Sequence, residues 1–272
     1  MNKVLIILFL LFPAMNWSQK NENTKVESVQ KELHVFLLMG QSNMSGFGEL
    51  LPTDSIPVEN VFIIPTLTRD TFYWKPASHP LHNRLSSDRF GLGLSFATEY
   101  LKNNPNVQIG LIPVAWGGAG IDQLNRGTAT FQDAVKKAQF ASHRGNIKGV
   151  LWHQGESDTV TEELANSYEQ KLHKLINDLR VELGISDLPF IAGNLAEFYG
   201  TGKEHNSIKR IEQINTVKKA LHDLPSKIPY TGFVETAGCK SIDSHFVHFN
   251  RESYIILGER YASKLIEINS NR

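Results

Sequence analysis

The sequence predicts an α/β fold in which a mostly parallel sheet lies between two layers of helices. Apolar runs of strand length alternate along the chain with segments whose apolar residues recur at helical spacing. Three of these apolar runs end in a short polar block, and a fourth polar block lies in a late loop. Because parallel strands end at the same edge of a sheet, we expect the polar blocks to meet there and form a site.

The first predicted strand is the uninterrupted apolar run of residues 35–39, which ends at Gly40. Such a run is typical of a strand that is buried on both faces. Ser42 follows at the start of a short helix, where main-chain amides can stabilise negative charge, so its hydroxyl is a candidate nucleophile. A plain strand-to-helix turn is the alternative interpretation.

Residues 46–89 are predicted to be irregular, with one short strand near residues 58–64, because prolines recur throughout the segment. Trp74 and a group of residues from His79 to His82 lie in this insertion. Loops at the mouth of an α/β site often contact substrate, although a surface loop with scattered aromatic residues explains the same pattern.

The second and third predicted strands each end in a block whose residues could take part in catalysis. Residues 107–115 form a strand that leads into Gly117 and Gly118, where a main-chain amide could donate to an oxyanion or simply form a tight turn. Residues 147–152 form a strand that leads into a polar block over residues 153–158. A polar helix entry explains one capping residue of that block, but not a histidine, a glutamine and a glutamate within four positions.

The remaining elements follow from apolar spacing and from helix start and stop signals. Thr159 and Glu162 form the pattern of a capping box, and Gly184 is placed to end the helix that follows. The other elements that we expect are helices over residues 90–101, 131–143 and 207–224 and strands over residues 189–198 and 230–235. A final helix is expected to bury one face, which carries Tyr254, Gly258, Tyr261, Leu265 and Ile268.

Length and charge limit the classes of function. A chain of 272 residues suits one sizeable α/β domain, which we expect over residues 33–272. Lys and Arg number 28, as do Asp and Glu, so nothing in the charge favours nucleic acid or an anionic membrane as a partner. A neutral or weakly charged substrate fits this balance better.

The amino-terminal residues predict export. Residues 1–18 combine a positive start, a short apolar core and small residues, which is the pattern of a cleaved signal peptide, and residues 19–32 form a flexible lead-in. The apolar run is too short to span a bilayer, so a retained anchor is the weaker alternative. We therefore expect a periplasmic or secreted protein. The single cysteine, Cys239, excludes an internal disulfide and a cysteine zinc site.

Four blocks resemble those of the SGNH/GDSL hydrolase superfamily, and most closely its carbohydrate-esterase branch of sialate O-acetylesterases and acetylxylan esterases (carbohydrate esterase family 6). They are Gly40-Gln41-Ser42-Asn43-Met44, the Gly117-Gly118 pair, His153-Gln154-Gly155-Glu156, and His248-Phe249 with the terminal helix. The resemblance implies a flavodoxin-like three-layer fold and a serine esterase that removes acetyl groups from carbohydrate. It also implies that Ser42 is the nucleophile and that Gly118 contributes to the oxyanion hole. The other oxyanion candidates are the Ser42 amide and the Gln154 side chain.

The resemblance also selects His248 as the general base, with His245 as its rival. The family usually has Asp three positions before this histidine, but here that position is His245. Asp243 and Glu156 are the two carboxylates that could orient the imidazole and stabilise its charged form, and the sequence does not decide between them.

We expect no metal and no other cofactor. His245, His248 and Asp243 could in principle hold zinc, but acid–base chemistry explains them as well. The expected partner is an acetylated carbohydrate, with no nucleic acid and, after signal cleavage, no membrane. The alternatives are a lipase or thioesterase of the same superfamily, and a glycan-binding protein that lost activity with the Asp position.

Overall fold

The computed structural model describes residues 31–66, 71–83 and 89–271, and the chain from Lys31 onward forms one compact unit. The predicted signal segment, residues 1–18, lies outside the described residues, as does most of the lead-in. The strands are β1 (Glu32–Gly40), β2 (Val61–Ile63), β3 (Lys75–Pro76), β4 (Val107–Pro113), β5 (Asn146–His153), β6 (Phe190–Gly193) and β7 (Thr231–Val234). The helices are α1 (Ser42–Ser45), α2 (Leu92–Asn103), α3 (Ala129–Ser142), α4 (Glu162–Leu183), α5 (Ile208–Lys227) and α6 (Arg251–Ser270). Short 3₁₀ turns are η1 (Pro52–Ser55), η2 (Ile121–Gln123) and η3 (Glu156–Thr159).

The seven strands form one sheet in the order β3-β2-β4-β1-β5-β6-β7. All neighbouring pairs are parallel except β2 and β3, which are antiparallel at the edge. Strand β1 lies between β4 and β5, so the chain leaves the centre of the sheet in two directions. This is the topological switch point, where ligands of open α/β sheets bind beyond the carboxyl ends of the strands.

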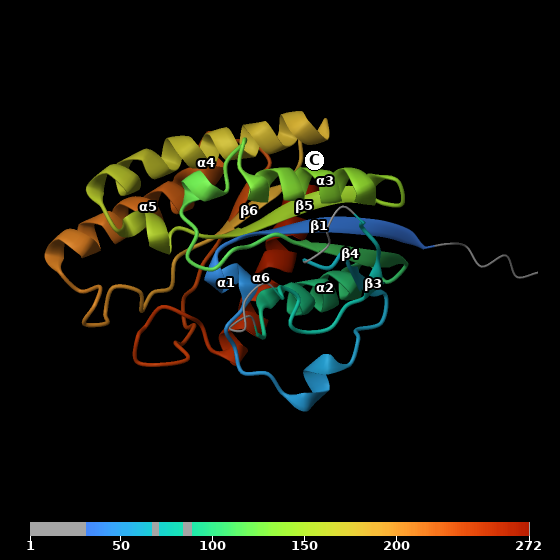
Figure 1. Cartoon of the computed structure of the whole chain (residues 1–272), viewed down its shortest axis with the longest axis horizontal. Coiled ribbons are helices and arrows are strands. Elements are labelled where there is room, and N and C mark those ends of the chain that lie inside the picture. The colour runs from blue at the N-terminus through green and yellow to red at the C-terminus, as the bar shows by residue number, and fades with distance from the viewer. Residues whose placement is uncertain (1–30, 67–70, 84–88, 272) are drawn as a thin grey trace, which may run out of the picture. The chain divides into compact units, whose positions relative to one another are not determined.

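Helices cover both faces of the sheet, as the sequence predicts. Figure 1 shows α3, α4 and α5 on one side of the sheet and α2 and α6 on the other. Helices α2 and α6 pack closely against each other. The close approach requires Gly258, because a Cβ at this position would lie 2.5 Å from the Cβ of Ser95. The predicted three-layer fold is therefore confirmed.

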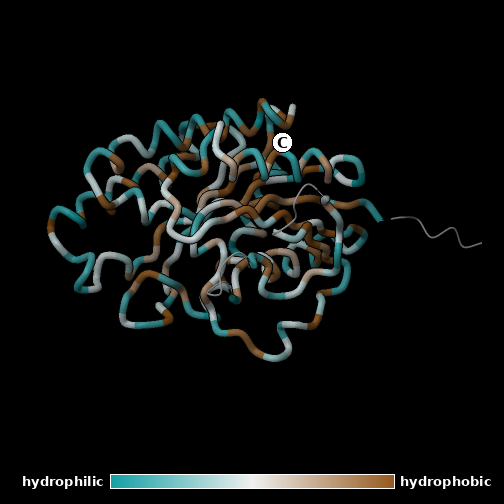
Figure 2. The backbone as a smooth tube through the Cα atoms, viewed as in Figure 1, coloured by the Kyte–Doolittle hydropathy of each residue, from teal (hydrophilic) through white to brown (hydrophobic). Residues whose placement is uncertain are grey.

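The core is centred on β1. Every residue of this strand after Glu32 is buried, which is why the sequence shows a continuous apolar run rather than an alternating one. Figure 2 shows the hydrophobic colour concentrated along the central strands, while the outer helices alternate between hydrophobic and hydrophilic residues. The most deeply buried strand therefore carries the first polar block at its carboxyl end.

The structure differs from the sequence prediction at several element ends. The N-cap of α4 is Thr161, whose hydroxyl accepts from the Leu164 amide (3.2 Å), whereas the Thr159 hydroxyl donates to the Glu156 carbonyl within η3. Strand β6 ends at Gly193, before the predicted end at residue 198, and Leu195 is buried in the loop that follows. Helix α5 continues past its predicted end and contains a proline in its last turn. Among the described residues, no helix is long and apolar enough to cross a membrane.

Candidate active site

The structure brings the three strand-end blocks together. The main-chain amide of Gln41 donates to the His153 carbonyl, and the main-chain amide of Trp116 donates to the Gly40 carbonyl, both at 3.0 Å. Gly40 has φ of +143°, and a Cβ at this position would lie 2.1 Å from the His153 carbonyl oxygen. Only glycine permits this approach, so the turn that leads to Ser42 depends on Gly40.

Ser42 lies at the centre of these blocks as the first residue of the single-turn helix α1. The residue is 5% exposed, and its Oγ lies 3.0 Å from Nε2 of His248. The two residues are 206 positions apart in the chain. The structure thus places the candidate nucleophile and the candidate base within hydrogen-bond distance of each other, which a proton transfer between them would require.

The His248 ring is held face to face against Phe47. The ring centroids are 3.8 Å apart and the planes differ by 7°. Burial lowers the pKa of His248 to about 4, while the negative charge of Asp243 acts in the opposite direction and the His245 charge adds to the lowering. The imidazole is therefore neutral near pH 7 and can accept a proton from Ser42.

The Glu156 carboxylate is bound by Asn43 rather than by His248. Its Oε1 accepts from Asn43 Nδ2 at 2.6 Å, and the same amide nitrogen donates to the Val247 carbonyl at 3.0 Å. The Asn43 Oδ1 accepts from the Phe249 amide (3.4 Å) and from the Tyr254 hydroxyl (3.0 Å). Asn43 thus fixes the main chain on both sides of the candidate base, and Glu156 fixes Asn43. Burial raises the pKa of Glu156.

Asp243 and His245 lie in an exposed loop before the candidate base. The Asp243 Oδ1 accepts from the His245 amide at 2.9 Å, and the His245 ring lies 3.9 Å from Glu204. Within the described residues, the Asp243 carboxylate makes no hydrogen bond to His248, and it acts on that ring through its charge alone. No group of three potential metal ligands assembles among the described residues.

Gly118 and Gln154 occupy different environments. Gly118 is exposed with φ of +73°, and no acceptor for its amide occurs in the part of the chain that the structure describes. The same holds for the Ser42 amide, so both can donate to a substrate. Gln154 is fully buried, and its amide nitrogen contacts Gln41 Oε1 (3.1 Å), the Ala119 carbonyl (3.1 Å) and Asp158 Oδ2. With two hydrogens and three acceptors, that nitrogen has no free donor.

Sequence reasoning assigned no role to Asn43 within the first block and did not identify Phe47 as part of the site. Asn43 directly follows the candidate nucleophile, so its position was the available signal. Phe47 lies in the segment that the prolines marked as irregular, and nothing in its local pattern indicates stacking on a histidine 201 positions later (248 − 47). Cys239 is a buried thiol that forms no disulfide, and burial raises its pKa.

Comparison with known proteins identifies the family. A family model described as carbohydrate esterase, sialic acid-specific acetylesterase, matches residues 32–267. A probable carbohydrate esterase of Arabidopsis thaliana is 31% identical over 191 residues, which make up 62% of this chain and 72% of the relative.

Solved structures share the fold. An X-ray structure of an Arabidopsis thaliana protein has a TM-score of 0.73 at 28% identity, with 86% of this chain and 98% of that chain covered. NanS has a TM-score of 0.74 at 16% identity, with 89% and 99% covered. A carbohydrate acetylesterase of Xanthomonas citri has a TM-score of 0.62 at 22% identity, with 88% and 57% covered.

Proposed function

This chain belongs to the carbohydrate esterase family of sialic acid-specific acetylesterases, and from that premise we propose that it removes O-acetyl groups from a carbohydrate through Ser42 and His248. That it is a carbohydrate esterase follows from the family. The residue roles rest chiefly on the 3.0 Å contact between Ser42 Oγ and a neutral His248 ring.

The proposed reaction has two halves. His248 Nε2 takes the Ser42 proton as Oγ attacks the acetyl carbonyl, and the tetrahedral oxyanion accepts from the Ser42 and Gly118 amides. The C–O bond to the sugar then breaks, and the sugar oxygen takes the proton from His248. A water molecule, deprotonated by His248, next attacks the acetyl-Ser42 ester, the bond between the acetyl carbon and Oγ breaks, and the proton on His248 returns to Ser42. Acetic acid leaves and ionises to acetate in solvent.

We assign the supporting role of acid to Asp243, because its charge is the interaction that favours the protonated form of His248. Glu156 is proposed to act as a positioning residue through Asn43. Gln154 is proposed to support the oxyanion hole indirectly, by fixing the Ala119 carbonyl beside Gly118, rather than as a third donor.

The finer points of substrate and location are also proposals. The family name and the neutral net charge of the chain support an acetylated sugar of the sialate or xylan type. The amino-terminal pattern supports export to the periplasm or the medium, with no membrane association after cleavage. A lipase or thioesterase would act on aryl or acyl-chain esters without preference for acetylated sugars, and a glycan-binding protein would hydrolyse neither.

A panel of esters tests the proposal. Purified protein would be given an aryl acetate, a long-chain aryl ester, acetylated xylo-oligosaccharide and O-acetylated N-acetylneuraminic acid, with Ser42→Ala as the control. We expect release of acetate from at least one sugar ester by the wild type only. Preference for the long-chain ester would favour the lipase alternative, and no hydrolysis of any ester would favour the glycan-binding alternative.

A further inference from the structure

The Tyr254 hydroxyl lies between the two groups that hold the candidate base. Tyr254 belongs to the first turn of α6 and is fully buried. Its hydroxyl accepts from the main-chain amide of Phe47 at 3.2 Å and donates to Asn43 Oδ1 at 3.0 Å. One oxygen atom therefore joins the segment whose ring stacks on His248 to the side chain that bonds the main chain on both sides of His248.

The direction of each hydrogen bond around this hydroxyl is fixed by its partners. The Phe47 amide can only donate, so the Tyr254 oxygen accepts there and its single proton is left for Asn43 Oδ1. Burial raises the pKa of Tyr254 well above its ordinary value, so the hydroxyl keeps that proton. Asn43 Oδ1 accepts a second hydrogen bond from the Phe249 amide, and both hydrogens of Nδ2 are also used. All four hydrogen-bonding positions of the Asn43 amide are thus occupied, and Tyr254→Phe would leave one of them empty.

The segment that carries Phe47 fits closely against the start of α6. A Cβ on Gly48 would lie 3.1 Å from Cδ2 of Tyr254 and 3.1 Å from Cα of Arg251. Both contacts would be tight, so glycine at this position lets the main chain approach Tyr254. The hydrogen bond from Phe47 to Tyr254 depends on this approach.

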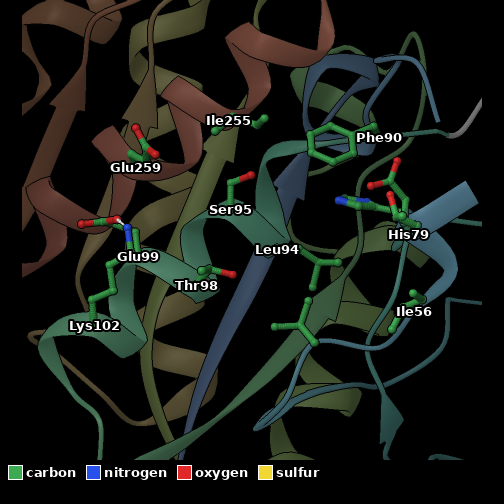
Figure 3. Close-up of a pocket in the computed structure, with 13 residues that line it drawn as sticks. Ile56, His79, Phe90, Leu94, Ser95, Thr98, Glu99, Lys102, Ile255 and Glu259 are labelled. Atoms are coloured by element: carbon green, nitrogen blue, oxygen red, sulfur yellow. Dashed lines mark hydrogen bonds and ion pairs between the residues drawn. The ribbon is translucent and has the colours of Figure 1, made fainter. Parts of the chain in front are cut away.

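Elsewhere the insertion packs less completely on the helices. The main chains of Gly48 and Phe90 exchange two hydrogen bonds, at 3.0 and 3.2 Å. Next to Phe90, a pocket of about 260 Å³ lies between the insertion and helices α2 and α6, with His79 and Phe90 on one side and Ser95 and Ile255 on the other (Figure 3). Because apolar packing does not fill this space, individual hydrogen bonds hold the segment, and the bond to Tyr254 is made by Phe47 itself.

We propose that Tyr254 is a positioning residue for the reaction, because its hydroxyl makes Phe47 and Asn43 act as one support for the His248 ring. Without the hydroxyl, the Phe47 ring and the main chain around His248 could move independently. The distance between His248 Nε2 and Ser42 Oγ would then vary, which slows proton transfer. The inference rests on the proposed function, in which Ser42 and His248 carry the reaction.

Tyr254→Phe tests the inference, since it removes one oxygen atom and keeps the ring. We expect kcat for the preferred ester to fall about tenfold while KM stays within about twofold, because the change misplaces the base without removing a contact to substrate. A buried tyrosine that supports only the fold would not produce this split between kcat and KM.

Tyr100→Phe is the matched control. Tyr100 is also buried, and its hydroxyl lies 2.9 Å from Nδ1 of His34, near the amino end of β1 and thus at the opposite end of the strand from Ser42. Both variants lose a buried tyrosine hydroxyl, so both should lower the midpoint of thermal unfolding by similar amounts. Only Tyr254→Phe should lower kcat.

A double-mutant cycle tests the link through Asn43. In Asn43→Ala the Tyr254 hydroxyl has lost its acceptor and can no longer join the two supports. Adding Tyr254→Phe to that variant should therefore lower kcat by less than about twofold. A further fall of about tenfold would show that Tyr254 acts without Asn43, and would overturn the proposed coupling.

NMR of protein labelled with ¹⁵N at histidine gives a readout that needs no turnover. The His248 ring signals, identified by their loss in His248→Ala, should shift or broaden in Tyr254→Phe and stay in place in Tyr100→Phe. Signals that stay in place in both variants would overturn the inference.

The kinetic results separate this inference from the proposed function. Wild-type kcat in folded Tyr254→Phe, with Ser42→Ala inactive, would overturn the inference and leave the proposed function standing. Equal losses of kcat in Tyr254→Phe and Tyr100→Phe would assign the effect to stability and would also overturn it. Wild-type hydrolysis by Ser42→Ala would contradict the proposed function instead, and the His248 signals would still test whether Tyr254 positions the ring.

Discussion

The two members of the proposed catalytic pair are held by different kinds of structure. Ser42 follows β1, the central strand, which is buried from Leu33 onward. The main chain around Ser42 is hydrogen-bonded to β5 and to the loop after β4. His248 follows a loop in which residues 242–246 are all exposed. It is held by stacking on Phe47 and by the hydrogen bonds of Asn43 to its neighbours.

This difference indicates where the site can be disturbed. The serine side is part of the folding core, so changes that displace it also destabilise the sheet. The histidine side depends on a few side-chain contacts, so its geometry can fail while the fold survives. We therefore expect substitutions of the residues that support His248 to lower activity more than their effect on the free energy of unfolding would suggest.

Removal of either member of the pair should have the largest effect. Ser42→Ala and His248→Ala should each lower kcat/KM by about 10³-fold or more, because nucleophile and base act as one unit. Acetate release from the preferred ester is the measurement. Ser167→Ala, a helix serine on α4 outside the site, should retain wild-type rates. Turnover by Ser42→Ala near that of the wild type would remove Ser42 from the mechanism.

Asn43→Ala removes the hydrogen bonds that support the main chain around His248 and leaves Ser42 Oγ and His248 Nε2 unchanged. The substitution leaves buried Glu156 without its 2.6 Å donor and frees the main chain around His248. We expect kcat to fall about 10²-fold, since small misplacements of a reacting group are costly. Stability should fall by roughly 1–3 kcal/mol, which chemical denaturation would measure. An unchanged kcat in a destabilised variant would show that Asn43 supports only the fold.

Substitution of Asp243 and substitution of Glu156 should lower kcat/KM to different extents. Asp243→Asn removes the charge that favours the protonated His248, and we expect kcat/KM to fall about tenfold, well below the roughly 10⁴-fold of a directly bonded triad acid. Glu156→Gln keeps an oxygen that can accept from Asn43 and should have a smaller effect. The reverse order would assign the acid to Glu156. Wild-type rates in both variants would indicate a Ser42–His248 dyad.

The pH profile should show the smallest effect. Only neutral His248 can act as the base, so kcat/KM should fall as pH decreases through the pKa of about 4 that burial gives this ring. The negative charge of Asp243 raises this pKa, so Asp243→Asn should move the acidic limb to lower pH. Glu156→Gln should leave the limb in place. A limb near the ordinary histidine pKa would contradict the lowered pKa that we assign to the partly buried His248 ring.

Much of the fold was predictable because burial leaves a pattern in the sequence. The apolar run of β1 and the helix between Glu162 and Gly184 follow from burial periodicity and end signals. The ends of β6 and the start of α4 were not predicted correctly. Leu195 is buried in a loop, and Thr161 rather than Thr159 accepts from a helix amide.

The candidate site was predictable where the chain itself brings residues together. Ser42, Gly118 and the block that begins at His153 follow three adjacent strands, so the order of strands places them at one edge. The contacts of Asn43 and Phe47 arise from side chains that meet groups 113 or more positions away, and no local pattern encodes them. The assignment of His248 came from the resemblance, and its role stays a prediction.

The most direct test of the central claim is covalent labelling of the active site. A fluorophosphonate probe would be applied to the wild type and to His248→Ala across pH, with the adduct located by peptide mass spectrometry. The account predicts a single adduct on Ser42, a labelling rate that falls below about pH 4 as His248 is protonated, and severely reduced labelling in His248→Ala. An adduct on another residue, or an equal labelling rate in His248→Ala, would contradict it.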